Sequence, residues 1–126
     1  MPLVEITLRR GKSVEYLRVL GEAVHGALVA QANVPADDRF QIVHQVGEGE
    51  LIADPSYAAV SRSEDLVVVR ITLNVGRTLE VKKNLYADMA RRASEAVDLR
   101  PDDLLICLVE VARENWSFGK GLATYG

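Results

Sequence analysis

The chain has 126 residues, a formal net charge of −3 and 26% charged residues, which suits a single domain of mixed helix and strand. Its basic residues are scattered along the chain, which argues against a nucleic-acid-binding protein. No apolar stretch approaches the ~20 residues that a membrane-spanning helix needs, and the first residues lack a secretory leader, so we expect a soluble, cytoplasmic protein without a membrane partner.

The first predicted element is a strand over residues 3–8, directly behind Met1 and Pro2, in which strongly apolar residues alternate with more polar ones. Removal of Met1 would turn the nitrogen of Pro2 from an amide into a secondary amine. An α-amino group has an ordinary pKa near ~8, so this amine could act as an acid, a base or an imine-forming nucleophile. Most Met-Pro starts have no such role, and Pro2 alone is only a candidate.

A helix is predicted next, because Ser13 is a good N-cap and apolar residues follow it at spacings of three and four. Pro35 disfavours helical backbone just before it and ends the helix near Asn33. A second strand is predicted over residues 40–46. A loop rich in glycine, serine and acidic residues follows over residues 47–65.

The second half of the chain repeats the first. Residues 6–15 and 71–80 share the pattern I-T-L-x-x-G-[KR]-[ST]-x-E at a constant offset of 65 residues, and the same offset places Asp38 on Asp103. Two distant matches at one offset indicate a duplicated unit. The second copy therefore has its own strand, a helix capped by Thr78 and a last strand over residues 104–111.

Each half reads as strand, helix, strand, and a helical crossover makes its two strands parallel. The predicted fold class is α/β, with two tandem β-α-β units forming one four-stranded mixed sheet and two helices on one face. All residues are assigned to a single domain. It comprises repeat 1 over about 2–46, a linker over about 47–65, repeat 2 over about 66–111, and a C-terminal segment over 112–126.

This architecture leaves one face of the sheet without a helix. The face would carry a mixed set of side chains too apolar to be left wholly to water, so we expect an oligomer to cover it. Glu5 and Arg70, which hold equivalent positions in the two repeats, are expected to form an ion pair across it. Cys107 lies in an apolar run and is expected to be a buried, unreactive thiol.

Four segments resemble motifs of the tautomerase superfamily, in particular those of its malonate semialdehyde decarboxylases. They are A-V-H at residues 23–25, V-P-A-D-D-R-F-Q-I-V at 34–43, D-L-V-V-V at 65–69 and W-S-F-G at 116–119. The resemblance runs over nearly the whole chain, and the second and fourth segments are its most specific parts. It implies a tautomerase-like fold, a homotrimer and a site that needs neither a cofactor nor a metal ion.

The resemblance also implies roles for individual residues. Pro2 takes the place of the catalytic proline and Asp38 that of the catalytic aspartate. The family pattern has two arginines after the third strand; here Asn74 stands in the first place, and Arg77 is the second, displaced by one residue.

The chemistry of the side chains at and near these positions suggests the substrate contacts. Arg77, the third catalytic residue, would bind a substrate carboxylate, and Asn74 would donate a hydrogen bond to it. Trp116 and Phe118 would form an aromatic wall of the site.

Without the resemblance, each assignment has a plainer structural interpretation. Asp38 has Asp103 as its repeat partner, so both could simply stabilise turns before strands. Arg77 has Lys12 as its repeat partner and could be a solvated charge. Trp116 and Phe118 could belong to the core.

The leading hypothesis is a metal- and cofactor-independent decarboxylase of malonate semialdehyde or a similar 3-oxo acid. A lesser hydratase activity on unsaturated 2-oxo acids would be consistent with it, because a cationic amine that stabilises an enolate also polarises a conjugated carbonyl. One alternative is a keto–enol tautomerase of a 2-oxo acid or a 3-haloacrylate dehalogenase. Another is a trimeric binding or scaffold protein without catalytic activity.

Overall fold

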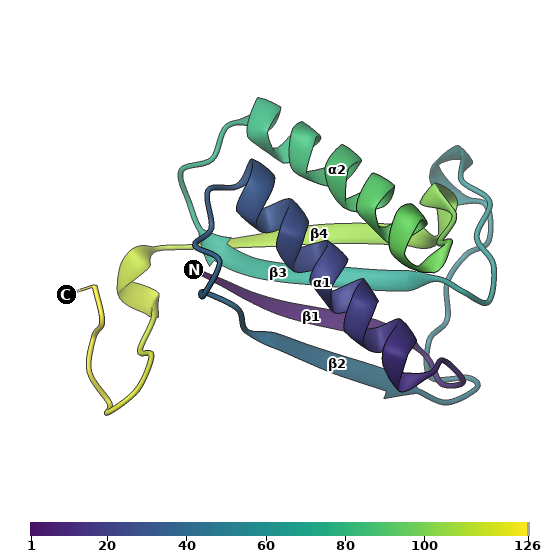
Figure 1. The fold of residues 1–126 in the computed structure, drawn as a ribbon, viewed down its shortest axis with the longest axis horizontal. Coiled ribbons are helices and arrows are strands. Elements are labelled where there is room, and N and C mark those ends of the chain that lie inside the picture. The colour runs from purple at the N-terminus through teal and green to yellow at the C-terminus, as the bar shows by residue number, and fades with distance from the viewer. Residues whose placement is uncertain (126) are drawn as a thin grey trace.

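The computed structural model describes residues 1–125 and contains four strands and two long helices (Figure 1). In chain order these are β1 (Pro2–Arg9), α1 (Val14–Gln31), β2 (Gln41–Val46), β3 (Val67–Asn74), α2 (Leu79–Val97) and β4 (Leu104–Val111). Three short 3-10 helices lie at Tyr57–Ala59, Pro101–Asp103 and Arg113–Asn115.

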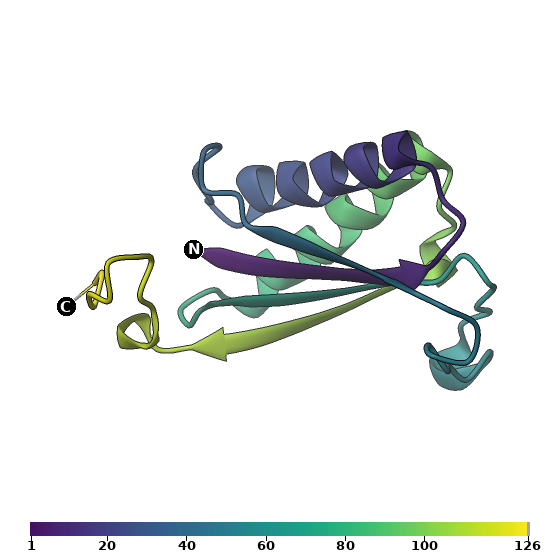
Figure 2. The same ribbon diagram turned by 90° about the horizontal axis from the view of Figure 1, so that it is seen from below.

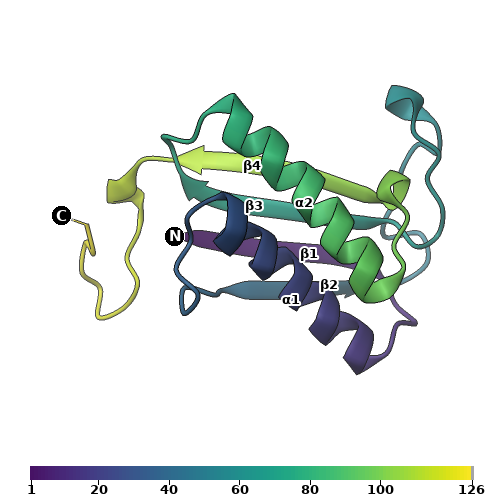
Figure 3. The same ribbon diagram turned by 45° about the horizontal axis from the view of Figure 1, so that its top comes forward.

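The strands form one mixed sheet in the order β2-β1-β3-β4. β1 is parallel to β2, β3 is parallel to β4, and the central pair β1 and β3 is antiparallel. Both helices cover the same face of the sheet, as the edge-on view in Figure 2 and the tilted view in Figure 3 show. The predicted fold class is therefore confirmed.

The helix boundaries have the same local causes in both halves. The hydroxyl of Ser13 accepts a hydrogen bond of 3.0 Å from the backbone N–H of Tyr16, and that of Thr78 accepts one of 3.2 Å from Val81. Such N-caps satisfy backbone N–H groups that have no partner within the helix. At the other end, α2 stops at Asp98 in a left-handed conformation, and α1 stops at Ala32.

The core lies between the helices and the covered face of the sheet. Every second residue of the two central strands points into it and is buried, as their alternating sequence predicts. Burial of one such side chain contributes about 1.5–3 kcal/mol. The largest buried side chains from strands and helices include Ile6, Leu8, Ile71, Leu73, Leu20, Leu28, Leu85 and Met89.

The other face of the sheet has no helix over it, as expected. Apolar side chains on its edge strands are open to solvent in the single chain: Ile42 on β2 is 45% exposed and Leu105 on β4 is 38% exposed. The prediction for Cys107 is wrong, because its thiol is exposed on this face. Its register partner is Arg70, which also points away from the helices.

The predicted ion pair between Glu5 and Arg70 is also wrong. Glu5 and Arg70 do lie directly opposite each other in the register of β1 and β3. The carboxylate of Glu5 nevertheless contacts Nε2 of His44 on β2, at 3.2 Å. The side chain thus turns towards the other neighbouring strand.

In the described part of the chain, no helix combines the length and the apolar character needed to cross a membrane.

Candidate active site

The residues predicted from the sequence to form a site lie together at one end of the sheet, where strands begin or end. β1 and β2 begin at this end of the sheet. β3, which is antiparallel to β1, ends there together with its parallel partner β4. The C-terminal end of α1 and the segment that follows β4 lie at the same end of the molecule (Figure 1). Residues from five separate parts of the chain therefore meet around the N-terminus.

Asp38 lies beside the start of the chain. Its Oδ2 is 3.4 Å from the terminal amino nitrogen of Met1, and its side chain is 19% exposed. Attraction between the carboxylate and the ammonium group is stronger here than in open water, because the pair is partly shielded from solvent.

The loop that carries Asp38 is held in place from both sides. The backbone N–H of Val4 donates to the carbonyl of Phe40 at 2.9 Å, which fastens the loop to β1. Nε2 of His25 on α1 lies 2.8 Å from the carbonyl oxygen of Ala36. His25 was not among the predicted site residues, since a histidine on a helix gives no sign in the sequence of the loop that it contacts.

Arg77 fastens the end of β3 to the end of α1. Its Nε and Nη2 donate to the carbonyl of Ala32 at 3.1 and 2.9 Å, and its Nη1 donates to the carbonyl of Asn74 at 3.2 Å. A cation is favourable at a helix C-terminus, where carbonyl groups lack partners. Three of the five N–H groups of the guanidinium are used in this way, so two remain for a ligand.

Gly76 shapes the turn that brings Arg77 into this position. Its φ of +128° belongs to a region that side chains rarely adopt, although an added Cβ would meet no atom within 4 Å. Backbone conformation rather than space therefore requires glycine here.

Asn74, the last residue of β3, is held by Trp116. The indole Nε1 donates to Oδ1 of Asn74 at 2.6 Å. This bond engages the oxygen of the amide and leaves its NH₂ group to donate elsewhere. Asn74 thus presents a hydrogen-bond donor where the related pattern has an arginine.

Phe118 packs beyond Trp116, with ring centroids 5.5 Å apart. Tyr125 adds a third ring at 5.6 Å from Phe118, in an edge-on arrangement, and Arg113 stacks on Tyr125 at 4.5 Å. The contribution of Tyr125 was missed from the sequence, because it depends on the C-terminal segment folding back on itself.

Two groups of contacts thus make up the site. One joins Met1 to Asp38, and the other joins Arg77, Asn74 and Trp116. Because Pro2 pairs with Leu73 in the β1–β3 register, the first group lies beside the second. Among residues 1–125, no three side chains of the types His, Cys, Asp and Glu lie close enough together to hold a metal ion.

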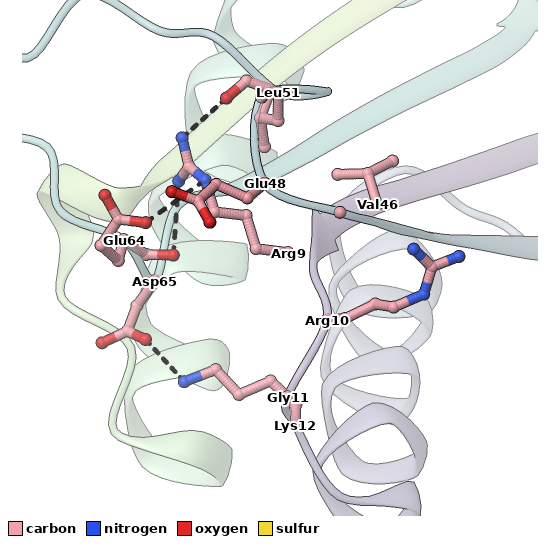
Figure 4. A pocket seen from close by; sticks show the side chains of 11 residues that line it. Arg9, Arg10, Gly11, Lys12, Val46, Glu48, Leu51, Glu64 and Asp65 are labelled. Carbon is pink, nitrogen blue, oxygen red and sulfur yellow. Dashed lines mark hydrogen bonds and ion pairs between the residues drawn. The ribbon is translucent and has the colours of Figure 1, made fainter.

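A separate cleft of about 580 Å³ lies at the opposite end of the sheet, where β1 ends (Figure 4). Its cations are paired within the protein: Arg9 contacts Glu64 and the carbonyl of Leu51, and Lys12 contacts Asp65 at 2.6 Å. The hydrogen bond to Asp65 raises the pKa of Lys12 above its usual value. Two of the three cations of the cleft are thus engaged, whereas Arg10, which is 3.8 Å from Glu50, remains largely exposed.

Comparisons with known proteins bear on the whole chain. Two family models, each described as tautomerase enzyme, match it over residues 38–119 and 2–60. The probable tautomerase YusQ of Bacillus subtilis (strain 168) is 39% identical over 123 residues, which span 98% of this chain and 97% of YusQ.

Solved structures give the same picture. A malonate semialdehyde decarboxylase, studied for its decarboxylase and hydratase activities, has a TM-score of 0.92 and 31% identity, covering 98% of this chain and 95% of its own. FG41 malonate semialdehyde decarboxylase inhibited by 3-bromopropiolate has a TM-score of 0.91 and 33% identity, covering 98% of this chain and 93% of its own.

Proposed function

The chain belongs to the tautomerase family of enzymes, and from this premise we propose that, once Met1 is removed, it decarboxylates malonate semialdehyde or a similar short 3-oxo acid. The observation that carries the proposal is the chain start, where the terminal amine of Met1, the residue before Pro2, lies 3.4 Å from the carboxylate of Asp38. The similarity to two malonate semialdehyde decarboxylases over 98% of the chain supports the choice of reaction.

The reaction needs a group that accepts the electrons of the breaking bond. When the bond between the carboxylate carbon and the neighbouring methylene breaks, carbon dioxide leaves and the electron pair forms an enolate. The protonated amine of Pro2, hydrogen-bonded to the former carbonyl oxygen, would stabilise this negative charge. Transfer of a proton to the methylene carbon then gives acetaldehyde from malonate semialdehyde, with one proton consumed.

Asp38 would assist by its charge. A carboxylate next to the amine favours the cationic form that the enolate requires. We therefore assign Asp38 to the catalytic group together with Pro2 and Arg77.

Arg77 and Asn74 would hold the substrate carboxylate. Two N–H groups of Arg77 are left after its contacts with the backbone, and the amide of Asn74 has its NH₂ group available. Trp116 and Phe118 would wall the site and limit the access of water, which strengthens the electrostatic contacts inside.

The decisive experiment measures the release of carbon dioxide and acetaldehyde from malonate semialdehyde. Protein whose intact mass confirms the loss of Met1 should turn the substrate over, and Pro2→Ala should lower kcat by at least ~100-fold, the usual scale of a catalytic proton donor. Far-ultraviolet circular dichroism would check that the variant is folded. An unchanged kcat in Pro2→Ala would refute the proposed mechanism.

A second candidate is favoured by the relative YusQ, which is described as a probable tautomerase at 39% identity. Keto–enol tautomerisation of a 2-oxo acid would use Pro2 as a base, and dehalogenation of a 3-haloacrylate would use it as an acid. Titration of the Pro2 nitrogen by NMR separates these uses, because a base must be neutral at pH 7. Inactivity on all three substrate classes would favour the remaining alternative, a trimeric binding or scaffold protein without catalytic activity.

The assembly that we propose is a homotrimer. The uncovered face of the sheet exposes Ile42 and Leu105 in the single chain, and burial of such side chains drives association. The resemblance of the chain to the tautomerase superfamily supports three copies rather than two.

A further inference from the structure

The two ends of the sheet have equivalent backbone features, because the two repeats are related by a constant offset of 65 residues. The N–H of Asp38 donates to the carbonyl three residues earlier at 3.0 Å, and that of Asp103 does the same at 2.9 Å. Gly11 and Gly76 have φ values of +122° and +128°. Each position of the candidate active site in these segments therefore has a structural counterpart at the opposite end of the sheet.

The counterparts of the proposed carboxylate-binding residues are two cations. At the offset of 65, Arg77 corresponds to Lys12 and Asn74 corresponds to Arg9. Arg9 and Lys12 line the cleft of Figure 4, and Lys12 also lines a cavity of about 240 Å³. Guanidinium and ammonium groups are the usual protein partners of a carboxylate. The second end of the sheet thus also has the donors that a carboxylate needs.

These two cations are already in contact with two consecutive acids of the linker (Figure 4). Nζ of Lys12 is 2.6 Å from Oδ1 of Asp65, and Nε of Arg9 is 3.5 Å from Oε2 of Glu64. The side chains of Arg9 and Lys12 are only 22% and 31% exposed, so both cations are partly shielded from solvent. The carboxylates at this end of the sheet therefore come from the chain itself.

The counterpart of Asp38 also holds the linker. The carboxylate of Asp103 accepts hydrogen bonds of 2.6 Å from the N–H and from the hydroxyl of Ser63. Ser63 directly precedes Glu64 and Asp65, so these bonds fix the segment that carries the two acids. A group tethered in this way binds at a high effective concentration. A free acid would have to displace it.

We propose that this end of the sheet is a carboxylate-binding site whose ligand is the chain's own pair, Glu64 and Asp65. In the wild type the pair closes the site to small acids. A short dicarboxylate would bind to Arg9 and Lys12 once the two side chains are neutral. Such a site would exist whether or not the chain is a decarboxylase, because it depends only on the contacts of the two cations.

The site can be tested by titration with malonate, whose two carboxylates can take the place of those of the linker. The test variant is Glu64→Gln/Asp65→Asn, which removes both charges and keeps the size of the side chains. Backbone amide signals in ¹H–¹⁵N NMR spectra report the binding. Gly11 directly precedes Lys12, and Gly76 marks the opposite end of the sheet, so the two ends are followed separately.

We expect malonate to shift the Gly11 signal of this double variant with a Kd at least ~10-fold lower than in the wild type, the scale of two partly exposed ion pairs. An equal Kd in the two proteins would overturn the proposal. If the double variant does not fold, Asp65→Asn alone should lower the Kd by at least ~3-fold, and no change would overturn the proposal equally.

The matched control is Glu48→Gln/Asp98→Asn. It removes two charges that line the same cavities and keeps the pair of Lys12 and Asp65. Its Kd at the Gly11 signal should equal that of the wild type. Binding as tight as in the test variant would overturn the site, because it would reflect net charge alone.

A last variant identifies the binding group. Lys12→Met, added to the test variant, should return the Kd at the Gly11 signal to the wild-type value, and tight binding without Lys12 would contradict its role. A wild type inactive on malonate semialdehyde would refute the proposed function and leave this site standing. The malonate titrations can refute the site alone.

Discussion

The indole nitrogen of Trp116 donates a hydrogen bond of 2.6 Å to the amide oxygen of Asn74. The bond joins the segment after β4 to the last residue of β3, and it decides which way the amide faces. Asn74 supplies the acceptor for this bond. The arginine that the related pattern has at this place cannot accept a hydrogen bond.

The first prediction concerns that position. Asn74→Arg should lower kcat/KM for malonate semialdehyde by ~5-fold or more, because Trp116 loses its acceptor and a second cation enters beside Arg77. Steady-state kinetics would measure the change, with Trp116→Phe as a companion that removes only the donor. A gain in turnover would mean that Asn74 is a weakened form of the related site rather than part of a reorganised one.

The second prediction concerns Asp38. Asp38→Asn should reduce kcat by ~10–100-fold with little change in KM, because the side chain keeps its size but no longer stabilises a positive charge on Pro2. Asp37→Asn is the control, since Asp37 is exposed and adjacent. If both variants had the same kcat as the wild type, Asp38 would have only a structural role.

The third prediction concerns Asp103, the repeat partner of Asp38. Its side chain is 1% exposed and accepts hydrogen bonds from the N–H and the hydroxyl of Ser63, both at 2.6 Å. Asp103→Ala should lower the free energy of unfolding by about 2–4 kcal/mol, because buried donors lose their partner. Urea denaturation would measure it, and the half-exposed neighbour in Asp102→Ala should cost less than about 1 kcal/mol.

The fourth prediction concerns pH. Burial alone would raise the pKa of Asp88, but hydrogen bonds from Arg92 and Arg91 outweigh it and hold the pKa below its usual value. The stability that Asp88 contributes is present above the ordinary unfolded value near ~3.9 and is lost as the pH falls through the lower folded value.

Asp88→Asn should therefore lose stability at pH 7 and flatten the decline in stability below about pH 4. Thermal unfolding from pH 3 to pH 7 would show it. Parallel curves for the variant and the wild type would contradict the assignment.

The fifth prediction concerns the uncovered face. Light scattering should give a threefold monomer mass for the wild type at micromolar concentration. Leu105→Glu should shift the protein towards the monomer, because it places a charge on a face that association buries. Val14→Glu, at a position that is 84% exposed on α1, should leave the mass unchanged. A monomeric wild type would argue against the trimer.

Much of the fold could be predicted from the sequence because its two halves carry the same pattern. The two copies share a strand pattern, an N-cap at Ser13 or Thr78 and a stop before a proline, and the structure has these elements in both halves. Helical crossovers then fix the parallel pairs. Local signals of this kind survive in the folded protein because the core reinforces them.

The two errors have different causes. The run around Cys107 is apolar throughout, so nothing in it tells which residues face the helices and which face away. The partner of Glu5 depends on the direction of its side chain: Arg70 is directly opposite on β3, but the carboxylate contacts His44, the β2 residue opposite Thr7.

The candidate site was also predicted in part: its residues could be found from the sequence, but their contacts could not. Residue types such as Pro2, Asp38 and Arg77 stand out by motif. Their contacts depend on tertiary structure: the backbone carbonyls that Arg77 binds lie on two different elements, and the ion pair between Met1 and Asp38 joins the start of β1 to the loop before β2.

The two repeats differ in how their first strands are joined to the rest of the chain. At one end β1 starts beside a chain terminus, whereas at the other β3 is entered from Asp65 and Leu66 through ordinary peptide bonds. The counterpart of Pro2 in the second repeat is Val67. The nitrogen of Val67 stays in a peptide bond when the first residue of the chain is removed, so it cannot become a free amine. A reagent that modifies the amine proposed for Pro2 should therefore label one position per chain, so that the stoichiometry of inactivation equals the number of chains and not the number of repeats.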